Sequence, residues 1–576
     1  MKDLKFKELI EKWNNSWDKA LNFWSNYTRL RRPIFITNRE EKNIYNVDNE
    51  SIAFIRLTDM LVIISCEKIV ELKLEDFSEE ILAHEIGHHT YCPADLTDQG
   101  RLISKIGRGL YNLKSFAPLV ANLYSDLMVN ERLFRINNLK LDKLYQNLKN
   151  DQMDKLWNFY MRIYEILWAL PKLTLTSMDI SSEMEGDSQL ANRIIKSYAN
   201  DWLKGASKFA VLCYQYISES DNTQLTFNKI FDTKSVGENA KDIPSGLTEC
   251  DDDEFDDNIN PEDIENDSNT KRNQTYKKNN KTGGKGNFRE PFRYGEILNS
   301  LGIKLSPEEI ATKYYKELAI PHLIPFPKKT TPISKEPIFE GLNSWDIGSP
   351  FEEINWFETV TKSPYVIPGI TTYSTIYGED AGQQRGEEPI GLYIYVDSSG
   401  SIPNPTHSLS YLTLCGTIIA LSALRAGSSI QVTLWSGKNE FIMTDGFVRN
   451  EAEILKILVG YFGGCTAFPI HVLRDTYSNR KPNSRKVHIL VISDDGVTTM
   501  FDKDEKGNSG KDIAKMALKN GDGGGTFVLN LYSENILTTN DLFVKAKDMG
   551  WNIYPVKSWE ELVDFSKDFV KKHYNK

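Results

Sequence analysis

Residues 390–401 read Ile-Gly-Leu-Tyr-Ile-Tyr-Val-Asp-Ser-Ser-Gly-Ser, and this stretch decides the fold of the C-terminal part of the chain. An apolar run that ends abruptly in a polar loop is typical of a strand buried on both faces of a sheet. Apolar runs and helical patterns alternate after it, which predicts a doubly wound α/β domain with a mostly parallel sheet over 390–576. Further strands are predicted at 430–435, 487–492, 526–531 and 551–556, and helices at 409–424 and 451–459.

Side chains that carry oxygen follow three of these strands. The carboxyl ends of parallel strands meet at one edge of a sheet, where ligands bind in open α/β folds. Mg²⁺ prefers an octahedron of hard oxygen atoms, so the sequence predicts a Mg²⁺ site there. Asp495 stays an alternative to Asp494, which is favoured because it directly follows the apolar strand and Ser493. The predicted ligands are Asp397, Ser399, Ser401, Thr466 and Asp494.

This pattern resembles the metal-ion-dependent adhesion site of von Willebrand A (VWA) domains, in which Asp-x-Ser-x-Ser is followed by a threonine and an aspartate on later loops. The resemblance implies a Rossmann-like VWA fold for 390–576. It also implies a docking role, because a carboxylate of a partner protein can fill one open coordination position of the ion. Residues 289–389 precede this domain and are expected to pack on it.

A second motif, His84-Glu85-Ile86-Gly87-His88, lies on a helix predicted from Ser78 to about Thr90. Two histidines four residues apart share one helix face, so both imidazoles can reach one ion. Glu85 projects beside them and can take a proton from a water activated by zinc. The motif therefore predicts a catalytic Zn²⁺ site with Glu85 as the general base.

A catalytic zinc needs a third protein ligand. The next long helix, predicted over 117–134, carries Asn122 and Asp126 one turn apart. We expect Asp126 to be the ligand, with Glu131 in reserve, and Asn122 and Asn130 to be hydrogen-bonding groups behind the ligands. The alternative is that Asp126 and Glu131 are exposed helix charges.

The two motifs together resemble metallopeptidases encoded with, or fused to, VWA domains. The resemblance implies a mainly helical, zincin-like domain over 1–235, a protein or peptide substrate, and a MoxR-type AAA+ ATPase as partner. The chain has no Gly-x-x-x-x-Gly-Lys-[Ser/Thr] phosphate loop, so we expect ATP hydrolysis to come from that partner. A non-enzymatic VWA adaptor or co-chaperone, working in protein remodelling or in the insertion of a metal into a cofactor, is the alternative function.

Composition limits these readings. A chain of 576 residues is too long to fold around one hydrophobic core, so several domains are expected. The net charge of −11 argues against a nucleic-acid partner. Apolar runs are too short to span a bilayer, the cysteines form no C-x-x-C pair, and no apolar leader is visible, so we expect a cytoplasmic protein. An acidic run at 251–257 and a basic stretch at 271–285 predict a disordered linker over 236–288.

Overall fold

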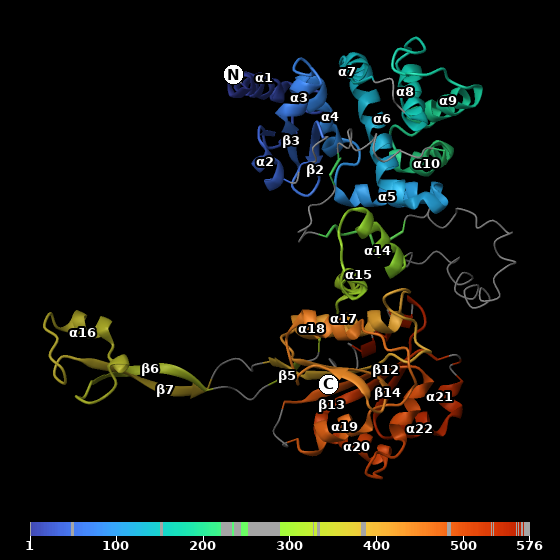
Figure 1. Cartoon of the computed structure of the whole chain (residues 1–576). Coiled ribbons are helices and arrows are strands. Elements are labelled where there is room, and N and C mark those ends of the chain that lie inside the picture. Colours follow the sequence, from blue (N-terminus) through green and yellow to red (C-terminus); the bar gives the residue numbers. More distant parts are fainter. Residues whose placement is uncertain are drawn as a thin grey trace. The chain divides into compact units, whose positions relative to one another are not determined.

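Figure 1 shows the computed structural model of the chain. By its contacts the chain divides into a first unit, Met1–Tyr314 with Thr406–Ser408, and a second unit, Tyr315–Pro405 with Leu409–Lys576. The structure describes residues 2–45, 47, 51–149, 154–219, 233–234, 243–250, 288–326, 328–330, 335–381, 387–480, 485–531, 533, 535–559, 561–562, 564–565 and 568–569.

The first unit combines a small sheet with many helices. The strand order is β1-β3-β2-β4, and β2 and β3 are antiparallel neighbours. The strands are β1 (Ile34–Ile36), β2 (Ala53–Arg56), β3 (Leu61–Ser65) and β4 (Thr233–Lys234). The helices are α1 (Lys2–Asn22), α2 (Arg39–Ile44), α3 (Cys66–Glu71), α4 (Ser78–Thr90), α5 (Leu96–Gly109), η1 (Tyr111–Phe116), α6 (Ala117–Asn137), α7 (Leu141–Leu148), α8 (Lys155–Leu167), α9 (Ser182–Ser197), α10 (Trp202–Ser218) and α14 (Pro291–Ser300).

Helix α4 lies deep in this unit, and its close contact with α6 depends on Gly87. A Cβ atom at Gly87 would lie 2.5 Å from Cγ1 of Val129 on α6 and 2.5 Å from the ring of Trp24. Such distances are far below van der Waals contact, so only glycine allows α6 to come this near. Both helices were predicted from the sequence, and both are confirmed at nearly the expected bounds.

The second unit contains a six-stranded sheet of order β11-β10-β9-β12-β13-β14, in which only β10 and β11 are antiparallel neighbours. The mostly parallel sheet predicted for 390–576 is therefore confirmed. Its strands are β9 (Gly391–Asp397), β10 (Ile430–Gly437), β11 (Glu440–Met443), β12 (Val487–Ser493), β13 (Asp522–Leu529) and β14 (Trp551–Pro555). Its helices include α17 (Tyr411–Arg425), α18 (Glu451–Leu458), α19 (Ile470–Ser478), α20 (Gly510–Gly521), α21 (Ile536–Thr539) and α22 (Asp541–Asp548).

Helices cover both faces of the six-stranded sheet, and shorter strand pairs precede it. In Figure 1, α17 and α18 cover one face of the sheet, and α19 and α20 cover the other. Strand β9 lies in the interior of the sheet, and all of its residues are buried. Before it, β5 (Lys328–Thr330) pairs with β8 (Glu387–Pro389), and β6 (Lys335–Ser344) pairs with β7 (Tyr373–Ala381) next to α16 (Trp356–Lys362).

Two segments differ from the domain boundaries expected from the sequence. The division between the units falls within α15 (Pro307–Ala319), so residues 289–314 belong to the first unit and not to the unit that contains the six-stranded sheet. Of the linker predicted over 236–288, residues 243–250 and 288 are described, and the others lie outside the described residues. In the described part Leu247 is fully buried against Gly100 of α5, so the prediction of disorder is wrong for this segment.

In the described part of the chain, no helix combines the length and the apolar character needed to cross a lipid bilayer.

Candidate metal centre

Three side chains from α4 and α6 converge in the first unit. Nε2 of His84 and Nε2 of His88 are 3.1 Å apart, and Oδ1 of Asp126 lies 3.3 Å from the latter and 3.9 Å from the former. The three ligand atoms all lie within 4.8 Å of one another. His88 and Asp126 are completely buried, and His84 is 8% exposed. This is the set of three residues that the sequence singled out, and it could hold a metal ion.

Hydrogen bonds on the outer side of both imidazoles determine which nitrogen faces this space. Nδ1 of His84 lies 2.7 Å from the side-chain oxygen of Asn130, and Nδ1 of His88 lies 2.9 Å from the carbonyl of Cys92. Both oxygens can only accept, so each Nδ1 carries a hydrogen, and each Nε2 faces the space between the rings, with its lone pair inward when the ring is neutral. At 3.1 Å the two Nε2 atoms can share a proton, or both can bind one cation when the rings are neutral.

Asp126 completes a donor set that fits such a cation. The Asn122 amide donates to Oδ2 at 3.0 Å, whereas Oδ1 has no hydrogen-bond partner among the residues that the structure describes. Burial raises the pKa of Asp126 to about 7, although His84 and the Tyr160 hydroxyl favour the charged form. A buried carboxylate oxygen beside two imidazole nitrogens could hold a metal ion, and zinc is a metal that takes such ligands. Asn122 and Asn130 form hydrogen bonds with Asp126 and His84, two of the three candidate ligands.

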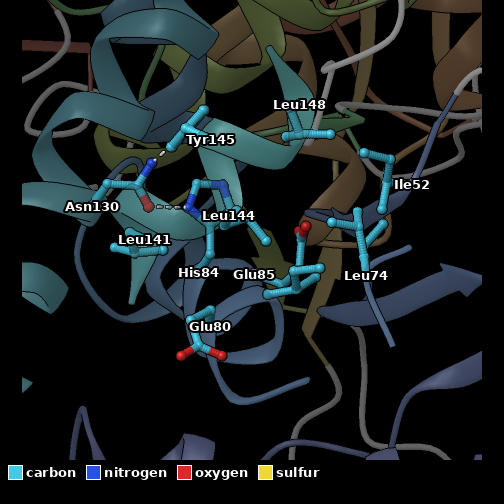
Figure 2. A pocket seen from close by; sticks show the side chains of 12 residues that line it. Ile52, Leu74, Glu80, His84, Glu85, Asn130, Leu141, Leu144, Tyr145 and Leu148 are labelled. Atoms are coloured by element: carbon cyan, nitrogen blue, oxygen red, sulfur yellow. Dashed lines mark hydrogen bonds between the residues drawn. The ribbon is translucent and has the colours of Figure 1, made fainter. Parts of the chain in front are cut away.

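Glu85 and Glu131 have different surroundings. Glu85 is 1% exposed and lines a pocket together with His84, as Figure 2 shows. Glu131 instead forms an ion pair with Arg135, one turn further along α6, and does not belong to the cluster. Of the two acids considered for the third ligand, the structure therefore brings only Asp126 to the histidines.

Two tyrosines behind the site were not predicted. The amide of Asn130 donates to the hydroxyl of Tyr145 at 3.0 Å and to that of Tyr164 at 2.8 Å. These bonds determine which end of the Asn130 side chain faces His84. Figure 2 shows the hydrogen bonds that join Tyr145 to Asn130 and Asn130 to His84. In the sequence both tyrosines resemble ordinary core residues of amphipathic helices, and no local signal connects them with the histidines.

The candidate Mg²⁺ residues of the second unit also come together. The Ser399 N–H donates to Oδ1 of Asp397 at 2.8 Å, and the Ser493 hydroxyl donates to Oδ2 at 2.6 Å. The hydroxyls of Ser399 and Ser401 are 3.1 Å apart, and that of Ser401 donates to Asp494 at 2.5 Å. Burial raises the pKa of Asp397 to about 6. The nearby charge of Asp494 also raises it, whereas the hydrogen bonds from Ser493 and Ser399 lower it.

The geometry also distinguishes between the two adjacent aspartates. Asp494 is 8% exposed and faces Ser401, whereas Asp495 is exposed. Thr466 lies beside the loop that carries Asp494. Its Cγ2 is 2.3 Å from the point where a Cβ atom of Gly496, two residues after Asp494, would be. The loop of Thr466 is attached to the serine loop through the Gly400 N–H, which donates to the Gly464 carbonyl at 3.0 Å.

No protein-family model and no curated protein sequence matches this chain.

Proposed function

We propose that this chain is a zinc-dependent metallopeptidase whose second unit binds Mg²⁺ and docks a partner protein. One observation carries the proposal: two inward imidazole nitrogens and a buried carboxylate oxygen lie within 4.8 Å of one another, and a second carboxylate lies on the same helix as the histidines. Two histidines and one acid are the protein ligands of many zinc-dependent hydrolases.

The residues have separate roles in this proposal. His84, His88 and Asp126 hold Zn²⁺, which when bound lowers the pKa of a water and polarises the carbonyl to be attacked. Glu85 accepts the proton of the attacking water on its carboxylate and then gives it to the leaving amine. Asn130 keeps the His84 ring in the orientation that points Nε2 at the ion.

The oxygen cluster around Asp397 supports the docking part. Its hydroxyls and carboxylates suit Mg²⁺, and they lie at the carboxyl end of β9, where ligands of open α/β sheets bind. A MoxR-type AAA+ ATPase is the partner that the resemblance implies, and a substrate protein is the other candidate. In either case, changing Asp397 to alanine should abolish capture of the partner while zinc stays bound to the first unit.

One observation favours a second function. His88 and Asp126 are fully buried, which is typical of a structural metal rather than a catalytic one. The chain would then be a non-catalytic adaptor that works with an AAA+ ATPase, and its second unit would be the active part.

Hydrolysis by purified, zinc-loaded chain distinguishes the two functions. We expect Glu85→Gln to keep one zinc per chain and to lose about 10²-fold to 10⁴-fold in kcat, because the general base is removed. Glu79→Gln is the matched control, since Glu79 lies on the same helix but binds Lys19 at the surface. His84→Ala should lose the zinc, whereas His89→Ala should keep it. Equal proteolysis by wild type and Glu85→Gln would refute the peptidase and leave the adaptor.

A further inference from the structure

A pocket opens beside the proposed catalytic residues, and its walls are mainly aliphatic (Figure 2). The space between its walls amounts to about 470 Å³, a volume that includes open solvent at the mouth. His84 and Glu85 form part of its wall, whereas His88 and Asp126 are not among the residues that line it. A group held in this pocket is therefore adjacent to the reacting atoms. Its apolar wall includes Ile52, Ala53, Leu74, Ile81, Leu144 and Leu148.

Two polar residues of the pocket, Glu80 and Asn130, form hydrogen bonds with other parts of the protein. The Glu80 carboxylate accepts a hydrogen bond from the Lys140 N–H at 3.3 Å. Asn130 bonds to His84 on one side and to Tyr145 on the other. Apart from His84 and Glu85, which the proposed function assigns to the chemistry, the surface that remains for a ligand is mainly aliphatic. Away from these two residues a charged side chain would lose its hydration with little compensation, whereas an apolar one would gain from burial.

One wall of the pocket is supplied by α7. Leu141, Leu144 and Leu148 follow one another at helical spacing on one face of this helix, and all three line the pocket. The same helix carries Tyr145, whose hydroxyl accepts a hydrogen bond from Asn130, the residue that orients His84. The apolar wall is thus fixed relative to the zinc ligands.

We propose that this pocket binds a large aliphatic or aromatic side chain of the substrate residue adjoining the scissile bond. The inference rests on the proposed peptidase function and adds a substrate class to it. Hydrophobic pockets discriminate by roughly 10-fold to 200-fold for each methylene group, so we expect Leu and Phe peptides to exceed the Ala peptide at least tenfold in kcat/KM.

The test uses zinc-loaded full-length chain and peptides of one sequence that carry Ala, Leu, Phe, Asp or Lys at each position around the cleaved bond. Mass spectrometry identifies the bond and gives kcat/KM. Leu148 is only half-buried, so Leu148→Trp should fold while filling the pocket, and the preference for Leu over Ala should fall to about one. Leu148→Asp should favour the Lys peptide. Leu190→Trp, at an exposed leucine of α9, should keep the wild-type preference.

Binding separates the pocket from the chemistry. Zinc-loaded Glu85→Gln, which should not turn over, is titrated with the Leu and Ala peptides by calorimetry, with and without Leu148→Trp. Tighter binding of the Leu peptide that disappears with Leu148→Trp supports the pocket even if the wild type cleaves nothing, in which case only the peptidase proposal fails. Cleavage or binding that ignores side-chain size and the Leu148 variants overturns the pocket and leaves the peptidase in place. Neither cleavage nor binding overturns both.

Discussion

The side-chain oxygen of Asn130 lies 2.7 Å from Nδ1 of His84, the ring nitrogen that does not face His88 and Asp126. This contact orients the imidazole from outside the cluster. Replacing Asn130 with leucine, which is similar in size, removes the acceptor. We expect Zn²⁺ affinity to fall about 10-fold to 100-fold, the usual effect of losing a partner behind a metal ligand. Competition with a chromogenic chelator measures this. Unchanged affinity would show that packing alone holds His84.

Gly87 controls the spacing of the two helices that carry the ligands. The methyl group of Gly87→Ala would meet Val129 and Trp24 at 2.5 Å, so α6 and α4 must separate. We expect a loss of about 1–3 kcal/mol in the free energy of unfolding, together with lower zinc content. Gly107→Ala on α5 is the matched control, because its Cβ would meet nothing nearer than 3.8 Å and helix propensity favours alanine by about 0.5–1 kcal/mol. Similar stabilities of the two variants in urea would contradict this reading.

Zinc binding should depend on pH through Asp126. Burial raises the pKa of this carboxyl to about 7 in the metal-free protein, and only the ionised carboxylate is a ligand. Below about pH 7 the ion must displace a proton from Asp126, so affinity should fall by up to about tenfold for each pH unit. Above that pH this contribution disappears. Chelator competition over a pH series measures the slope, and an affinity that stays constant below neutrality would contradict the expectation.

The two adjacent aspartates of the second unit should behave differently. Asp494 faces Ser401 and is nearly buried, whereas Asp495 is exposed. We expect Asp494→Ala to abolish Mg²⁺ binding and Asp495→Ala to leave it nearly unchanged, as titration calorimetry can measure. Zinc content should stay the same in both variants, because the first unit is not altered. Loss of Mg²⁺ binding in Asp495→Ala alone would mean that the loop rearranges around the ion.

Much of the candidate site could be predicted because its residues lie at fixed spacings on regular elements. The interval between His84 and His88 is one helical turn, and the interval between Asn122 and Asp126 is another, so each pair shares a face whatever the rest of the fold does. The choice of Asp126 over Glu131 could be favoured from the sequence, but the structure adds the reason: Glu131 has its own cation in Arg135.

Other parts depend on tertiary contacts that leave no local pattern. Tyr145 and Tyr164 lie on α7 and α8, and their contact with Asn130 arises only when three helices pack together. Helix α7 is short, and an amphipathic stretch of that length has no stop or start signal strong enough to specify it. The segment around Leu247 was assigned to a linker because charged and polar residues dominate the composition around it. In the structure Leu247 is buried against α5, and the composition around it does not indicate this contact.

That small segment determines how the first unit can be shortened. Leu247 and Ile297 of α14 both lie against Gly100 of α5, and the Arg289 N–H donates to the Thr248 carbonyl at 2.7 Å. A truncation at residue 235, where the composition changes, would remove Leu247, Thr248, Arg289 and Ile297. The apolar side of α5 would then face water. Such a fragment should aggregate when it is expressed by itself, even though it retains both histidines, Glu85 and Asp126.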